Sequence, residues 1–226
     1  METKEIISNI KTIYSKYGVP VHLQLHMLRS AAVVEIICNN LNCEVKKEDV
    51  VGAMLIHDMG NIVKMRFDDK DNLKLLVKED LERVEELKQR QKEFIKEYSD
   101  DDLEVNHRIS KELGANKLIQ DLLDETSFKD ACKINKFNYL ELMLRGYGDW
   151  RVGPYGILTL DERVEEVKER YTQKNIQIYK NTTVSEEKLD SLLICAKEVE
   201  KKIFDKCSIK PDEISDLTIK KYLDKY

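Results

Sequence analysis

Glycine and proline are scarce in this chain of 226 residues, which contains 8 glycines and 3 prolines. These two residue types interrupt helices and form turns, so their scarcity favours long unbroken segments. Charged residues make up 36% of the chain and apolar residues 42%, a balance typical of amphipathic helices with solvated Lys/Glu faces. The sequence therefore predicts an all-α fold and argues against all-β and collagen-like structures.

Apolar residues recur at the helical period in several segments of the chain. We expect helices over residues 3–16, 22–41, 46–59, 71–98 (one or two), 107–113, 159–171, 186–204 and 217–223. The acidic cluster at residues 100–102 predicts a helix start, and Thr159 with Glu162 forms a capping box. We expect one functional unit, with residues 1–175 as its main domain and residues 176–226 as a helical extension packed on it.

Charge, apolar runs and cysteine usage restrict the partners and the location. The net charge of −5 comes from thoroughly intermixed acids and bases, which argues against nucleic acid as a partner. No stretch approaches about 18 uninterrupted apolar residues, so we expect no membrane span, and the first ten residues show no secretion signal. The five cysteines are scattered and odd in number, so we expect free thiols in a cytoplasmic protein.

The segment RGYGDWRVGPYG, residues 145–156, is the conspicuous irregular part of the sequence. It holds four of the eight glycines and one of the three prolines. Such a composition predicts a loop, and loops on a rigid scaffold often carry function. Asp149 lies within it.

Two histidines and two aspartates have the order H…HD…D along the chain. His57 and Asp58 lie at the end of a helix that becomes apolar, where the pair alone is more often a hydrogen-bonded structural feature. His26 lies 31 residues before His57 on another apolar helix, and Asp149 lies 91 residues after Asp58. With the contexts HMLRSA, AMLIHDMGN and GYGDWRVGPYG, this order resembles the HD-domain phosphohydrolase superfamily over about residues 22–165.

The resemblance implies a compact multi-helix HD-domain bundle with additional C-terminal helices. It also implies that His26, His57, Asp58 and Asp149 bind a divalent metal ion, whose identity among Mn, Co, Ni, Fe, Mg and Zn is open. A metal-bound hydroxide would attack the phosphate ester of a nucleotide or another small phosphorylated metabolite, with His57 and Asp58 as catalytic residues. Both phosphomonoesterase and phosphodiesterase activity fit this expectation.

Further polar residues are candidates for contacts with the substrate. Arg29 and Arg151 could each form bidentate hydrogen bonds with a phosphate, and an ordinary ion pair is an equal alternative for each. Lys64 could also reach phosphate, although a solvated lysine is the more common explanation. His107 resembles the first of the extra histidines found in relatives with two metal ions, but a second histidine near residue 124 is absent. We therefore expect one ion, with His107 contacting phosphate.

Several neighbouring side chains have weaker candidate roles. We expect His22 either to support the metal ligands from outside the ligand set or to be structural, rather than to bind the ion itself. We expect Tyr147 and Trp150 to pack in the core rather than stack on a base. Glu35 and Glu125 are weak candidates for orienting the ligating imidazoles.

Two other functions remain open. A non-catalytic module that binds metal and nucleotide would give tight ligand binding without turnover. A helical interaction protein, in which the His and Asp residues only pair with one another, would bind no metal. A homodimer is compatible with either the enzyme or the module.

Overall fold

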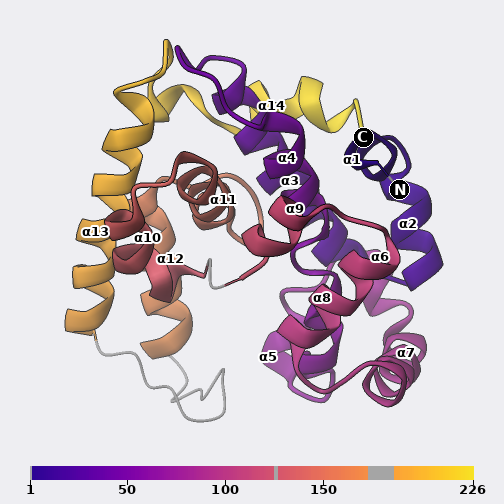
Figure 1. The fold of residues 1–226 in the computed structure, drawn as a ribbon. Coiled ribbons are helices and arrows are strands. Elements are labelled where there is room, and N and C mark those ends of the chain that lie inside the picture. The colour runs from indigo at the N-terminus through magenta and orange to yellow at the C-terminus, as the bar shows by residue number, and fades with distance from the viewer. Residues whose placement is uncertain (1, 125–126, 173–185) are drawn as a thin grey trace.

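The computed structural model describes residues 2–124, 127–172 and 186–226, and within these ranges the chain is helical and contains no strand (Figure 1). The elements are α1 (Thr3–Ser8), α2 (Ile10–Tyr17), α3 (Val21–Cys38), α4 (Lys47–Ile56), η1 (Met59–Lys64), α5 (Lys70–Leu73), α6 (Lys78–Leu81), α7 (Val84–Glu97), α8 (Asp102–Glu112), α9 (Lys117–Leu122), η2 (Phe128–Asp130), α10 (Ala131–Phe137), α11 (Leu140–Trp150), α12 (Leu160–Thr172), α13 (Glu186–Phe204), η3 (Pro211–Glu213) and α14 (Asp216–Leu223). The predicted all-α class is confirmed.

Helix α3 is the central element of the bundle. It packs against α4, α11 and α14, so residues far apart in the sequence meet along its length. By length and composition alone, α3 is also apolar enough to cross a membrane, but 61% of it is buried inside the structure. Mostly buried core helices pass the same test, so its apolar character is accounted for by packing.

The start of α3 is fixed by a buried carboxylate from another helix. Asp80 of α6 has no exposed surface and accepts hydrogen bonds from the backbone N–H groups of Val21 and His22, each at 2.8 Å. Its Oδ2 also lies 3.0 Å from Nδ1 of His22. Asp80 therefore takes the place of a local N-cap side chain, and His22 has the structural role expected from the sequence.

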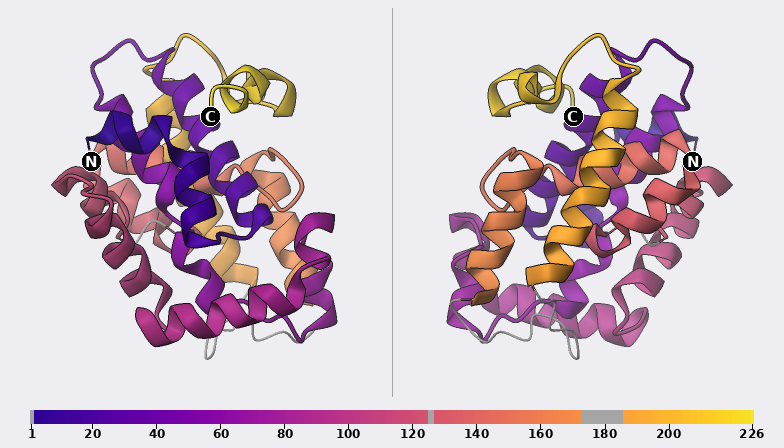
Figure 2. Two further views of the ribbon diagram at one scale, coloured as in Figure 1. Left: turned by 90° about the vertical axis from the view of Figure 1, so that its right-hand side faces the viewer. Right: turned by 90° about the vertical axis from the view of Figure 1, so that its left-hand side faces the viewer.

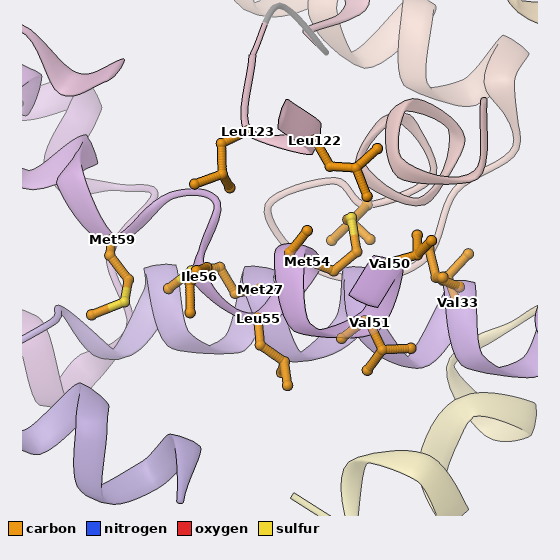
Figure 3. Packing of buried hydrophobic residues seen from close by; sticks show 14 of the residues in the cluster. Met27, Val33, Val50, Val51, Met54, Leu55, Ile56, Met59, Leu122 and Leu123 are labelled. Atoms are coloured by element: carbon orange, nitrogen blue, oxygen red, sulfur yellow. The ribbon is translucent and has the colours of Figure 1, made fainter. Parts of the chain in front are cut away.

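From Val50 onward, helix α4 is buried on all sides. Its residues from Val50 to Ile56 are buried, which explains why the sequence shows an apolar run there and no polar face. Figure 3 shows Met54 and Leu55 of α4 packed beside Met27 of α3 in this core. The run ends at a short turn that carries His57 and Asp58.

Most predicted helix starts agree with the structure. The side chain of Asp101 accepts a hydrogen bond from the backbone N–H of Glu104 and caps α8. Thr159 and Glu162 form the reciprocal bonds of a capping box at the start of α12. Residues 71–98, predicted as one or two helices, instead form the three helices α5, α6 and α7.

The prediction of a loop around Asp149 is wrong. Gly146, Gly148 and Asp149 all lie inside α11, and only the part after Trp150 is irregular. A Cβ atom on Gly148 would lie 2.5 Å from Cγ2 of Val34, a side chain of α3. Here glycine permits two helices to approach closely, and the chain does not turn there.

The prediction that all cysteines are free is also wrong. Cys132 of α10 and Cys195 of α13 form a disulfide bond, with their Cα atoms 4.9 Å apart. Cys38, Cys43 and Cys207 are free. The sequence separation of 63 residues explains why the local spacing of cysteines does not indicate the bond.

The C-terminal helices lie against the rest of the described chain. Helix α13 packs on α10, α11 and α12, and the right-hand view of Figure 2 shows it lying beside α12 across one face. Lys225 and Tyr226 both bond the carboxylate of Glu35 on α3, at 2.6 and 2.5 Å. The predicted boundary near residue 175 falls outside the described residues.

Candidate metal centre

Three packed helices bring together the four side chains of the H…HD…D pattern. His26 lies in the middle of α3, His57 and Asp58 follow the last residue of α4, and Asp149 lies near the end of α11. Each of these helices packs against the other two. The pattern found in the sequence therefore corresponds to one cluster in space.

Most of the polar atoms of this cluster face one another. Nε2 of His26 lies 3.2 Å from Nε2 of His57 and 3.0 Å from Oδ1 of Asp149. Asp58 places its two carboxylate oxygens 3.6 Å from the same two imidazole nitrogens. Nε2 of His57 also lies 3.5 Å from Oδ1 of Asp149.

The tautomer of His57 is set by its second ring nitrogen. Nδ1 of His57 lies 2.7 Å from the carbonyl oxygen of Met54, which can only accept a hydrogen bond. Nδ1 therefore carries the proton, and in the neutral ring Nε2 presents its lone pair to the cluster. A backbone carbonyl is a common partner for the second nitrogen of a metal-binding histidine.

The turn that carries His57 and Asp58 is held from two sides. The hydroxyl of Tyr14 donates a 2.6 Å bond to the carbonyl oxygen of Leu55, just before the turn. The side chain of Asn106, on α8, accepts a 2.7 Å bond from the backbone N–H of Gly60, just after it. These bonds fix the backbone on which the two candidate ligands are mounted.

The cluster lies at the border between the core and the solvent. The side chain of His57 is 1% exposed, whereas those of His26, Asp58 and Asp149 are 21%, 23% and 23% exposed. The inner wall of the site is therefore dry, and its outer edge can be reached from solution.

Asp149 is held as an anion in this setting. Burial raises the pKa of its carboxyl group, but the hydrogen bond from His26, together with the neighbouring His57 ring, lowers the pKa well below its usual range. On the other side, Nη1 of Arg145 lies 3.7 Å from Oδ2 of Asp149. Burial in turn lowers the pKa of Arg145, against the charges of Asp149 and Asp58. The sequence alone did not lead us to Arg145, although its position one turn before Asp149 is a signal.

His26, His57 and Asp58 could together hold a metal ion, because they offer one ligand atom each within 4.8 Å of one another. The lone pair of His57, fixed by the Met54 carbonyl, fits this use. Asp149 adds a carboxylate oxygen next to both imidazoles. Two imidazoles with carboxylates form a donor set suited to divalent first-row metals.

The structure does not give Arg151 the predicted phosphate contact. Its side chain is buried, and its guanidinium donates to the hydroxyl of Tyr147 and the carbonyl oxygens of Leu158, Pro211 and Ile214. It therefore joins α11 to the C-terminal segment. The hydroxyl of Tyr147 also donates to Glu200, so Tyr147 is a core residue as expected.

The other predicted substrate contacts lie in ion pairs with acids outside the four-residue cluster. Nε of Arg29, one turn beyond His26 on α3, lies 4.0 Å from Oδ1 of Asp216. Nζ of Lys64 lies 2.6 Å from Asp102, and Nε2 of His107 lies 2.6 Å from Oδ1 of Asp124. Each of the three would have to exchange its acid for a phosphate to play the predicted role.

The remaining candidates have other partners. Glu35 does not orient an imidazole, because its two oxygens bind Lys225 and Tyr226. Glu125 lies outside the described residues. Trp150 is buried and packs edge-on against Phe128, as a core residue does.

Comparison with known proteins gives no further guide to identity. No family model, no curated protein and no solved structure matches the chain. Any assignment of function therefore rests on the geometry of the cluster and on the order of its residues in the sequence.

Proposed function

We propose that the protein is a metal-dependent phosphohydrolase of the HD-domain type, acting on a phosphate ester of a nucleotide or another small phosphorylated metabolite. One observation carries the proposal. His26 and the adjacent pair His57 and Asp58 come from different helices, and their ligand atoms all lie within 4.8 Å of one another at the edge of the core. Asp149 completes the set.

A divalent ion held by these residues would lower the pKa of a bound water and take up charge that develops on the phosphoryl oxygens. The mixed nitrogen and oxygen donors favour Mn, Fe, Co, Ni or Zn over Mg, which prefers oxygen ligands.

Residues of the chain would orient the ligand, accept a proton and exclude solvent. His57 is held by the Met54 carbonyl with its Nε2 lone pair toward the cluster, so it needs no reorientation when a cation binds. Asp58 lies at the solvent edge, where a carboxylate oxygen can accept a proton from the attacking water. The buried α4 and η1 exclude solvent from the inner side.

The test is phosphate release from a panel of nucleotides and sugar phosphates, by protein reloaded separately with Mn, Co, Ni, Fe and Mg. Asp58→Ala should abolish metal-dependent turnover. Asp68→Ala is the matched control, because Asp68 is an exposed aspartate paired with Lys88, and this variant should keep full activity.

Full activity in Asp58→Ala would refute the proposal. Tight binding of nucleotide or metal without turnover across the panel would instead assign a binding module. Absence of metal binding would leave the cluster as a set of core residues that satisfy one another.

A further inference from the structure

Arg145 is a buried cation beside the metal centre that lacks ordinary partners. Arg145 is 4% exposed and lies on α11 one turn before Asp149. Two of its guanidinium nitrogens, Nε and Nη1, are buried without any hydrogen-bond partner. The acid that it faces, Asp149, has its Oδ2 3.7 Å away, which is too far for a hydrogen bond.

Arg151, at the end of the same helix, shows what a structural arginine looks like in this protein. It is buried to a similar degree, yet its donors bond one hydroxyl and three carbonyl oxygens. Arg145 has the same burial and no such set of acceptors. Packing or capping therefore does not explain why an arginine stands at position 145.

Arg145 has a carboxylate nearby, but a buried guanidinium whose nitrogens lack hydrogen bonds is still unfavourable for folding, because arginine stays protonated at any relevant pH. Chains retain such groups mainly at functional sites, where a ligand supplies the missing hydrogen-bond acceptors. The location of Arg145, against the second oxygen of a candidate metal ligand, points to a ligand of the same site.

Charge balance indicates what kind of ligand this is. Asp58 and Asp149 carry two negative charges, which a divalent cation neutralises. Arg145 then leaves the site with a positive charge, whereas the charge of Arg29, one turn from His26 on α3, is balanced by Asp216, whose Oδ1 lies 4.0 Å from its Nε. On the dry inner side of the site, the positive charge of Arg145 favours an anion with two negative charges over one with a single charge.

We propose that Arg145 is a specificity-determining residue that selects a dianionic phosphoryl group, as in a phosphomonoester, over the monoanion of a phosphodiester. This inference rests on the proposed function, because it assigns the substrate class of the same site. It also holds if the protein only binds its ligand, since the selection acts on binding.

The test uses the full chain loaded with Mn²⁺, with inorganic phosphate as the probe and calorimetry as the readout. Arg145→Met keeps an unbranched stem but removes the guanidinium and its charge, and should weaken phosphate binding at least tenfold. Arg145→Lys keeps the charge and should bind phosphate within about threefold of the unchanged protein. If the methionine variant does not fold, Arg145→Gln serves the same comparison.

Two further readouts separate this role from a structural one. Arg145→Met should not weaken Mn²⁺ binding, because the substitution removes a positive charge that repels the ion. It should also not lower the thermal stability of the metal-free protein. Arg151→Met, the matched control, should lower that stability because it leaves buried carbonyl groups without donors.

Equal phosphate affinity in the methionine and lysine variants would overturn the inference. A parallel loss of Mn²⁺ affinity in Arg145→Met would also overturn it, and would show that Arg145 only positions Asp149. If the active protein hydrolyses monoesters and diesters equally well, and Arg145→Met leaves this ratio unchanged, the proposed enzyme stands and the selection by Arg145 does not.

Discussion

Gly148 sets the distance between α11 and α3, so Gly148→Ala should damage the candidate metal centre much more than the stability of the fold. An added Cβ would lie 2.5 Å from Cγ2 of Val34 and 3.2 Å from the carbonyl oxygen of Ser30. An ordinary contact between carbon atoms is about 3.5 Å or more. The two helices must therefore separate by about 1 Å, because valine in a helix has little rotational freedom.

The expected loss of stability is small. Overpacking lowers the free energy of unfolding by about 1–3 kcal/mol, whereas replacing a glycine by alanine within a helix raises it by about 1 kcal/mol. The net loss is about 0–2 kcal/mol, which lowers the melting temperature by no more than about 8 °C for a chain of this size.

The effect on the site should be larger, because Asp149 is the next residue and its Oδ1 lies only 3.0 Å from His26. A displacement of about 1 Å in a reacting constellation costs on the order of 100-fold in rate. We expect Mn²⁺ affinity to fall at least tenfold, measured by calorimetry, while thermal unfolding in chelator shows a folded protein.

Gly146→Ala is the control for this experiment. Its added Cβ would be crowded too, but by the ring of Trp150 and the tip of Ile134 rather than by α3. That variant should lose stability and keep its affinity for Mn²⁺. A folded Gly148→Ala protein with unchanged Mn²⁺ affinity and turnover would refute the account of how α11 places Asp149.

Two further predictions concern charged groups. Asp80→Ala leaves the backbone N–H groups of Val21 and His22 without their acceptor, so the free energy of unfolding in urea should fall by about 2–4 kcal/mol. Asp80→Asn keeps one acceptor oxygen, so this variant should lose less stability. Equal stability of the two variants would contradict the capping role. Because the pKa of Asp149 is lowered in the folded protein, the stability it contributes is complete above the unfolded-state pKa of about 3.9 and is lost as the pH falls through the folded-state pKa. In metal-free protein, urea midpoints should therefore fall more steeply below about pH 4 in the unchanged chain than in Asp149→Asn, and parallel curves would show that this carboxylate is not stabilised by folding.

The parts of the fold that depend on local patterns could be predicted from the sequence. The period of the apolar residues placed α3 and α13 closely, and the capping residues Asp101 and Thr159 marked two helix starts. Glycine was the main source of error, because Gly148 reads as a turn residue by itself and becomes a packing residue only when Val34 of another helix is known. The disulfide between Cys132 and Cys195 likewise depends on which helices meet.

The candidate site, too, could be predicted only in part from the sequence. The order of His26, His57, Asp58 and Asp149 could be read from the chain, and the structure brings all four together. The arginines could not be distinguished from one another, because the role of a guanidinium depends on its surroundings. Arg151, beside the motif, is held by carbonyl groups of the C-terminal segment, while Arg145 lies next to Asp149.

The separation of His26 and Asp149 by 123 residues has a kinetic consequence. Closing a loop of that length costs on the order of 4 kcal/mol in chain entropy, so the contact forms only when other packing supports it. The centre is therefore assembled late in folding and does not act as a nucleus. Metal uptake should come after the folding of the bundle, and the delay between the recovery of helical signal and the capture of metal during refolding would measure how late α11 docks on α3.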